Sequence, residues 1–281
     1  MHKPDKRLNV YRPDLANEAL RDEVAADKYV TGKLRQFIKP ISTMHRSPRA
    51  DAMQISQALL GQICCMYEDA AGWAWVQLQH DNYVGYVHAD NLSEVITPVT
   101  HVVSAVSTFI YPNPDLKTQP AIVIPMNAGL CVTAREGDYL ALQGGGFVFA
   151  GHAREAANAS SDFVAVAEKF LHVPYLWGGN TQQGIDCSGL VQVALNACGI
   201  ASPRDSDMQQ VQLGNALLIN DLSGLQRGDL IFWDGHVGIM ADSATLLHAN
   251  GYHMCTVLEP FEAAVKRIAE KGYPITAIKR L

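Results

Sequence analysis

Long apolar runs are missing from this sequence of 281 residues. No stretch approaches the roughly twenty apolar residues that a membrane-spanning helix needs. Residues 1–30 carry charges throughout and have no apolar core of the kind found in a secretory signal. We therefore expect a soluble, cytoplasmic protein that does not bind a membrane.

An excess of basic residues is also missing. Lysine and arginine number 22 together, against 28 aspartates and glutamates, which gives a formal net charge of −6. A chain with this balance does not attract polyphosphate as a whole, so we expect no general binding to nucleic acid. The composition fits a small or neutral partner better.

Cysteines are few, and none of them forms a CxxC pair. The six cysteines are too few to cross-link a chain of this size, and their spacing indicates neither a zinc ribbon nor a thioredoxin-type site. We therefore expect no metal or other cofactor. Most of the thiols should be buried and free.

The polarity and hydrophobic periodicity of the sequence change at three points. Residues 1–30 are polar with short helical patches and read as an N-terminal arm. Residues 31–98 consist of short alternating segments, among them WAWVQLQHDNYVGYV, which has the pattern of a hairpin. Residues 99–155 repeat this rhythm, with glycine and proline between short strands. In residues 156–281 helical spacing comes first and strands follow, which predicts an α+β unit after two small all-β modules.

The segment GIDCSGLVQVAL places Cys187 where an apolar helix begins. Free backbone N–H groups and the helix dipole at such a position can lower the pKa of a thiol below its usual value of about 8.5. His236 and His248 follow at the edges of two predicted strands, twelve positions apart. Adjacent antiparallel strands would bring both rings to one end of the sheet. His236 could then take the proton from Cys187 while His248 holds the His236 ring in its productive tautomer.

Each of these residues also has a plainer interpretation. A cysteine in an apolar helix can be a buried thiol that does no chemistry. His236 and His248 can be partly exposed strand residues. The combination of the three in this order, rather than any one of them, favours catalysis.

The same segments carry a family resemblance. VPYLWGGNTQQGIDCSGLVQVAL, PRDSDMQQ, LQRGDLIFWDGHVGIM and LLHANG, in this order, resemble the NlpC/P60 family of papain-like cysteine peptidases, which act on bacterial cell-wall peptides. The resemblance begins near residue 158 and runs to the end of the chain. It implies a papain-like α+β catalytic domain in which Cys187 is the nucleophile, His236 the base and His248 the orienting residue.

The resemblance also gives Tyr175 a role. In this family a tyrosine hydroxyl helps the backbone N–H of the nucleophile, here Cys187, to hold the oxyanion, and loss of one such donor costs about 2.7 to 4 kcal/mol of transition-state stabilisation. The alternative is that Tyr175 fills space beside Trp177.

The two β modules resemble bacterial SH3 domains, which are small barrels. Two such modules before an NlpC/P60 domain resemble the cytoplasmic γ-D-glutamyl-L-diamino acid endopeptidases that recycle murein peptides. The resemblance implies a substrate such as L-Ala-γ-D-Glu-diaminopimelate, cut after D-Glu and required to have a free N-terminal L-alanine. We expect the two modules to contribute to substrate specificity at the active site. Targeting of the protein to the cell wall and a spacer role are the alternatives.

Recognition of a free amine requires an anion that has little water around it. Asp205 could serve, although it could instead cap a helix beginning near Ser206. Tyr83 could reach the substrate from the first β module, although it could equally belong to the core of that module. The implied substrate ligands are Asp205 and Ser206 for the amine, Asp186 and Ser188 for the D-glutamyl part, and Tyr83 and Asp51 from the first β module.

Three other functions fit parts of the sequence. A papain-like amidase or acyltransferase that acts on lipids would need an exposed apolar anchor, which the sequence lacks. A non-catalytic peptide-binding module would have no use for Cys187, His236 and His248 together. A metal site made of His248, His253 and Cys255 has no fourth ligand at a suitable spacing. We therefore expect a cysteine endopeptidase that hydrolyses a γ-D-glutamyl bond in murein peptides.

Overall fold

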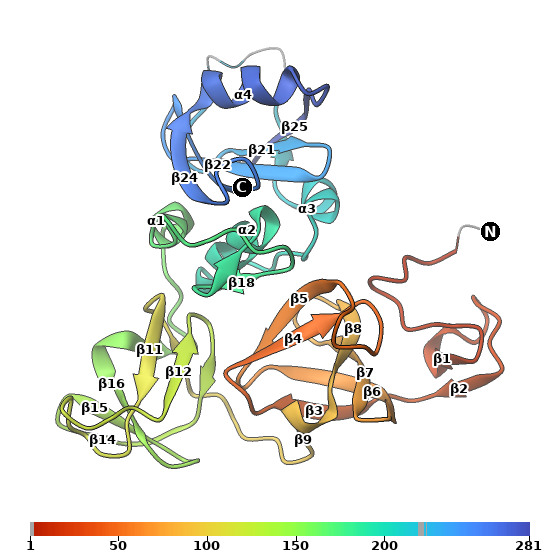
Figure 1. The fold of residues 1–281 in the computed structure, drawn as a ribbon, viewed down its shortest axis with the longest axis vertical. Helices are drawn as coiled ribbons and strands as arrows, with labels where there is room; N and C mark the ends of the chain where they lie inside the picture. The colour runs from red at the N-terminus through yellow and green to blue at the C-terminus, as the bar shows by residue number, and fades with distance from the viewer. Residues whose placement is uncertain (1–2, 219–221, 223) are drawn as a thin grey trace. The chain divides into compact units, whose positions relative to one another are not determined.

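The computed structural model describes residues 3–218, 222 and 224–281 (Figure 1). The chain forms two compact units, Met1–Ala157 and Asn158–Leu281. All four α-helices in the described residues belong to the second unit, and the first unit consists of strands and single 3₁₀ turns. None of the helices in these residues is long and apolar enough to cross a membrane.

The N-terminal arm contains no α-helix among its described residues. One 3₁₀ turn, η1 (Glu18–Leu20), lies between β1 (Leu15–Asn17) and β2 (Lys28–Val30), which pair in parallel. The predicted helical patches are therefore wrong. The segment is too short to offset the cost of nucleating a helix in isolation, and its apolar residues pack against Trp75 of the first β module instead.

A seven-stranded antiparallel sheet forms the first β module, with the strand order β5-β4-β8-β7-β6-β3-β9. The predicted hairpin is confirmed, because β7 pairs antiparallel with β8 across the polar turn. The strands are β3 (Lys33–Phe37), β4 (Ile41–His45), β5 (Gln54–Leu59), β6 (Ile63–Ala70), β7 (Trp73–Leu78), β8 (Val84–His88) and β9 (Leu92–Ser93), with η2 (Ala89–Asn91) before the last.

The second β module consists of three small antiparallel sheets, ordered β13-β10-β17, β11-β12 and β14-β15-β16. Its core contains Val103, Ile124 and Val148, and Leu60 of the first module packs against this core. The elements are β10 (His101–Val103), β11 (Ser107–Ile110), β12 (Ile122–Pro125), β13 (Gly129–Leu130), β14 (Val132–Glu136), β15 (Tyr139–Leu142), β16 (Phe147–Phe149), η3 (Ala150–His152) and β17 (Ala153–Glu155).

The second unit contains a six-stranded antiparallel sheet with the order β20-β25-β21-β22-β23-β24. Helix α2 packs against β22 and β23, and α4 packs against β23 and β24. The sheet strands are β20 (Asn215–Ala216), β21 (Leu230–Trp233), β22 (His236–Met240), β23 (Thr245–Asn250), β24 (Cys255–Pro260) and β25 (Ile275–Arg280). The other elements are α1 (Phe163–Glu168), β18 (Asn180–Thr181), β19 (Gly184–Ile185), α2 (Cys187–Ala197), α3 (Ser206–Gln212) and α4 (Phe261–Ala269).

The ends of the first two helices follow from local sequence. Asp162 caps α1, where its carboxylate accepts hydrogen bonds from the backbone N–H groups of Val164 at 2.9 Å and Ala165 at 3.0 Å. After α2, Gly199 takes a φ of +71°, which glycine adopts without strain and which ends a helix. The predicted α+β order, with helices first and most strands later, is confirmed in this unit.

Candidate active site

Cys187 is the first residue of α2, as the sequence predicts, and it is buried. The backbone N–H groups of Val237 and Ser188 lie against its sulfur and act to lower its pKa. Burial and the negative charge of Asp186 act more strongly in the opposite direction and raise the pKa of Cys187 to about 12. The expected lowering of this pKa is therefore wrong. The helix begins where predicted, but its N-terminal end is buried and carries an acidic cap.

The two predicted histidines do meet at one end of the sheet. His236 begins β22 and His248 lies in the neighbouring strand β23, and His236 Nε2 lies 2.9 Å from His248 Nδ1. Because Val237 follows His236 directly, the contact between its N–H and the Cys187 sulfur places the thiol beside the start of β22. Burial, then the charge of His248, lowers the pKa of His236 to about 3. The thiol and the imidazole are therefore both neutral in this state.

Tyr175 lies on the same side of the domain, in the segment between α1 and β18. Its backbone N–H donates to the carbonyl of Met254 at 2.9 Å, which ties this segment to the turn before β24. Burial raises the pKa of Tyr175, and the negative charges that Cys187 and Asp186 can carry raise it further. The Tyr175 hydroxyl therefore interacts electrostatically with the Cys187 thiol, and it keeps its proton and can donate a hydrogen bond.

A cavity of ≈ 290 Å³ adjoins the histidine pair. Both imidazoles line it, and so do two cationic side chains, Arg267 and Lys271. Both cations also lie over the ring of Tyr252, with Arg267 4.3 Å and Lys271 5.5 Å from its centroid. The cavity therefore offers positive charge and aromatic surface next to the two rings.

Comparisons with known proteins identify two domains in the chain. Residues 172–269 match the model of the NlpC/P60 family. Residues 44–92 match the model of the bacterial dipeptidyl-peptidase SH3 domain. The chain contains an NlpC/P60 domain and a bacterial SH3 domain. The SH3 match lies within the first β module.

Curated relatives of the NlpC/P60 chain include enzymes named for γ-D-glutamyl peptides. Dipeptidyl-peptidase 6 of Lysinibacillus sphaericus is 29% identical over 185 residues, which cover 66% of this chain and 66% of that protein. γ-D-Glutamyl-L-lysine dipeptidyl-peptidases of Bacillus cereus and Bacillus subtilis are 39% and 33% identical over 75 and 98 residues. These two matches cover 27% and 32% of this chain, and 21% and 32% of those proteins. The chain thus spans just under two thirds of the first relative and a third or less of the other two.

Solved structures show the same fold. An NlpC/P60 family protein from Bacillus cereus has a TM-score of 0.73 at 19% identity, covering 88% of this chain and 99% of that one. An NlpC/P60 endopeptidase from Photobacterium damselae has a TM-score of 0.61 at 13% identity, covering 88% and 71%. At these identities the likeness concerns the fold alone.

In the NlpC/P60 domain, the side chains on either side of Cys187, those of Asp186 and Ser188, form hydrogen bonds within the protein. Asp186 caps α2 by accepting from the Gly189 N–H at 2.7 Å, and it forms a two-pronged ion pair with Arg204 at 2.7 and 3.0 Å. Arg204 also donates to the Ser188 hydroxyl at 2.9 Å, and all three side chains are buried. Protein donors therefore already contact the side chains of Asp186 and Ser188, and binding of the D-glutamyl part by these two residues stays a prediction.

Asp205 and Ser206 stand directly after Arg204, at the start of α3, and both are half-buried. Asp205 occupies the N-cap position of α3, but its side chain makes no capping hydrogen bond in that helix. The alternative in which Asp205 acts as a helix cap is therefore not supported. Asp205 directly follows Arg204, the residue whose guanidinium pairs with Asp186.

Tyr83 and Asp51 belong to the first unit. Tyr83 is buried and directly precedes β8, and its backbone N–H donates to Asp81 at 3.0 Å. Asp51 lies in the turn between β4 and β5, where its carboxylate is 73% exposed and pairs with Arg49 at 2.6 Å. An exposed, paired carboxylate lacks the low-water setting that reading an amine requires. The proposed roles of both residues stay predictions.

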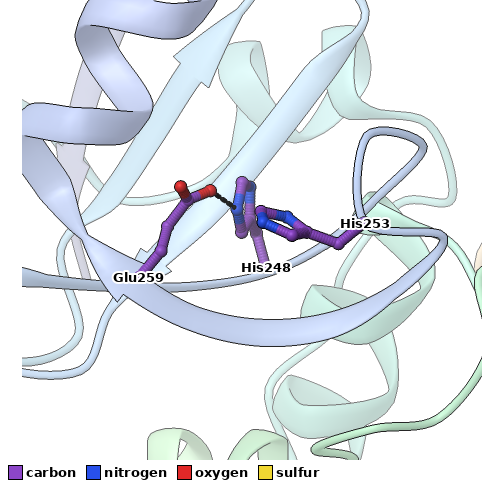
Figure 2. Close-up of side chains that lie close together, drawn as sticks. All are labelled: His248, His253 and Glu259. Atoms are coloured by element: carbon purple, nitrogen blue, oxygen red, sulfur yellow. Dashed lines mark hydrogen bonds and ion pairs between the residues drawn. The ribbon is translucent and has the colours of Figure 1, made fainter.

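Figure 2 shows a group of side chains that sequence reasoning missed in part. Ligand atoms of His248, His253 and Glu259 all lie within 4.8 Å of one another, as in a metal site. However, His248 Nε2 lies 2.7 Å from a Glu259 oxygen, and Arg267 pairs with that same oxygen. A cation would have to displace a proton and compete with the guanidinium, so these contacts favour hydrogen bonding over metal binding.

Neither Glu259 nor Arg204 was predicted to belong to the site. Glu259 comes from β24, opposite Leu246 of β23, and no local motif marks it. Arg204 does lie within the segment PRDSDMQQ, so its place next to Asp205 was a usable signal. A buried arginine needs a buried carboxylate, and Asp186 is the one that it finds.

Proposed function

We propose that this protein is a cysteine endopeptidase that hydrolyses the bond between γ-D-glutamate and a diamino acid in murein peptides with a free N-terminal L-alanine. The observation that carries the proposal is the hydrogen-bonded pair of His236 and His248 beside the buried thiol of Cys187. The names of the curated relatives support the substrate class. The papain-like character of the catalytic domain is part of the same proposal.

The reaction begins from the neutral pair. As the Cys187 sulfur attacks the γ-carbonyl carbon of D-glutamate, its proton passes to His236 Nδ1, because Nε2 of that ring faces His248. The oxygen of the tetrahedral intermediate accepts hydrogen bonds from the Tyr175 hydroxyl and from the backbone N–H of Cys187. That N–H has no partner within the helix, because Cys187 is the first residue of α2.

Breakdown returns the proton. The nitrogen of the diamino acid takes it from His236 as the C–N bond breaks, which leaves a thioester on Cys187. A water molecule then attacks the thioester and gives a proton to His236, and the departing sulfur recovers that proton. Lys271, which lines the cavity, suits a leaving group that carries a carboxylate.

The proposal also covers the remaining domains and the setting of the reaction. The arm spans residues 1–30, SH3-like modules span 31–98 and 99–155, and the catalytic domain spans 156–281. Asp205, Ser206 and Asp51 bind the amine, Asp186 and Ser188 bind the D-glutamyl part, and Tyr83 contacts the substrate. The reaction belongs to cytoplasmic recycling, since a hydrolase that needs a free amine spares the intact wall.

A comparison of two peptides tests the function. The purified protein should release L-Ala-D-Glu from L-Ala-γ-D-Glu-meso-diaminopimelate, and N-acetylation of the peptide should slow this by about 100-fold or more, because the half-buried carboxylate of Asp205 then loses its partner. Cys187→Ala should abolish cleavage. Cys198→Ala, one residue beyond the same helix, is the matched control and should retain it.

Two results would count against the proposal. Equal rates on the free and the acetylated peptide would contradict the reading of the amine. Turnover by Cys187→Ala at the wild-type rate would contradict the assignment of Cys187 as the nucleophile. Replacing diaminopimelate by lysine in the same assay measures the preference for the diamino acid.

A further inference from the structure

Glu259 ends the chain of hydrogen bonds that begins at His236. Its side chain is 13% exposed, while that of His248 is fully buried, and its Oε1 lies 2.7 Å from His248 Nε2 (Figure 2). Arg267 of α4 pairs with the same oxygen and is itself held over the ring of Tyr252. Burial acts to raise the pKa of Glu259, but the hydrogen bond with His248 and nearby positive charge outweigh it and leave this pKa lowered. Glu259 is therefore an ionised acceptor.

A second group competes for the same nitrogen. The Asn250 Nδ2 lies 3.0 Å from His248 Nε2. The orientation of the Asn250 amide is fixed, because its Oδ1 accepts from the backbone N–H groups of Tyr252 at 3.1 Å and His253 at 2.8 Å. Asn250 can thus only donate to Nε2, whereas Glu259 can only accept from it.

The two contacts require opposite tautomers of His248. The contact with Glu259 is shorter and involves a charged acceptor, and hydrogen bonds to ionised groups are roughly twice as strong as neutral ones. The carboxylate therefore places the proton on Nε2 of His248. Burial lowers the pKa of His248, so the ring carries one proton only, and its Nδ1 must be a bare acceptor.

This choice passes on to His236. A bare Nδ1 on His248 must accept from His236 Nε2 across their 2.9 Å contact, so the single proton of His236 is on Nε2. The Nδ1 of His236 is then bare and can take a proton from Cys187. With the opposite tautomer of His248, Nδ1 of His236 would already carry a proton and could not act as the base.

We propose that Glu259, held in place by Arg267, is a positioning residue that fixes the tautomers of His248 and His236 and thereby makes His236 a base. Its kinetic consequences rest on the proposed function. The tautomers themselves do not, and they can be measured without a substrate.

The first test observes the ring nitrogens directly. In protein labelled with ¹⁵N-histidine, one-bond couplings in NMR spectra should place the protons of both rings on Nε2 in the wild type. In Glu259→Leu the Asn250 amide can donate to Nε2 without competition from the carboxylate, so both protons should move to Nδ1. Glu262→Leu, the same substitution on an exposed position of α4, should leave the wild-type pattern. Unchanged tautomers in Glu259→Leu would overturn the inference.

The second test uses rescue. In Glu259→Leu/Asn250→Asp, the new carboxylate keeps Oδ1 for the backbone N–H groups and offers its other oxygen to His248 Nε2, which should restore the proton to Nε2. Alkylation of Cys187 by iodoacetamide should slow in Glu259→Leu and recover in the double variant. Calorimetry of both variants should check that they are folded. Failure of the folded double variant to recover would contradict the role assigned to the acceptor.

Kinetics on the murein peptide complete the test. Glu259→Leu should lower kcat by about 10²- to 10⁴-fold, as loss of a general base does, with KM changed by less than about twofold. A loss confined to KM would contradict a positioning role. If the wild type cleaves no murein peptide, the proposed function fails, while the NMR and alkylation results still decide the role of Glu259.

Discussion

At Cys187, burial and the charge of Asp186 outweigh the effect of the helix N-terminus, so the sulfur keeps its proton. A nucleophile in this state depends on its base at the moment of attack. The buried ring of His236 is neutral, because burial lowers its pKa, and it can therefore accept a proton. The tautomer and the position of His236, rather than a permanent thiolate on Cys187, thus prepare these two residues for the reaction.

The same burial makes stability depend on pH. In the unfolded chain His236 titrates near its ordinary pKa of 6.5, whereas burial lowers that pKa to about 3 in the folded protein. Below pH 6.5 the unfolded state therefore binds a proton that the folded state does not. The stability due to the neutral ring is complete above this pH and is lost as the pH falls, by at most about 1.4 kcal/mol per pH unit.

Calorimetric unfolding of the wild type and of His236→Asn between about pH 7.5 and about pH 4.5 measures this loss. The variant lacks the hydrogen bond to His248 and should be less stable at the upper end. The difference in stability should shrink as the pH falls, because only the wild type takes up the extra proton on unfolding. A difference that stays constant with pH would contradict the buried, neutral state of His236.

At the scale of elements, the pairing of β22 with β23 brings the two histidines together. Ile239 pairs with Leu247 and Met240 with Leu246, so this register sets Gly238 opposite His248. His236 and His248 are therefore diagonal neighbours, a separation that aromatic side chains can span. Gly238 leaves room beside His248, since a Cβ at this position would lie 3.3 Å from His248 Cβ.

Gly238→Ala should disturb the pair without touching a reacting group. Its new Cβ would lie 2.8 Å from Leu246 Cδ1 and 3.3 Å from His248 Cβ, so both side chains must shift. We expect a stability loss of about 1–3 kcal/mol and a fall in kcat of about 10- to 100-fold. Thermal unfolding and peptide turnover measure the two effects. Gly144→Ala, where a Cβ has nothing within 4 Å, is the control, and equal behaviour of the two variants would contradict the role given to Gly238.

For the whole molecule, local sequence patterns predicted what depends on neighbours along the chain. The start of α2 at Cys187 and the hairpin of β7 and β8 both follow from such patterns. The meeting of His236 and His248 followed from the expectation of adjacent antiparallel strands.

What depends on distant partners was not predictable in this way. The pairing of Asp186 with Arg204 joins residues eighteen positions apart, and the contact of His248 with Glu259 depends on the register of β24. The thiol pKa was misjudged for the same reason, because its burial is set by surrounding elements rather than by its place in α2. The arm lost its predicted helical patches to packing against the first β module.

Selection of the substrate belongs to this largest scale, because the proposal draws amine ligands from both units. Asp205 is half-buried, whereas Asp51 is 73% exposed and already paired with Arg49. A charged hydrogen bond in a sheltered site is worth about 1.5–3 kcal/mol, and an exposed one contributes much less. The two acids should therefore differ in what their removal does.

Asp205→Asn should lower kcat/KM for the peptide with a free amine by about 10- to 100-fold, mainly through KM, and leave the slow cleavage of the N-acetylated peptide unchanged. Asp51→Asn should have a smaller effect than Asp205→Asn, because the Asp51 carboxylate is exposed and already pairs with Arg49. Steady-state kinetics on both peptides separate these outcomes. If Asp205→Asn lost activity equally on the two peptides, the carboxylate would act on the structure around α3 and not on the amine.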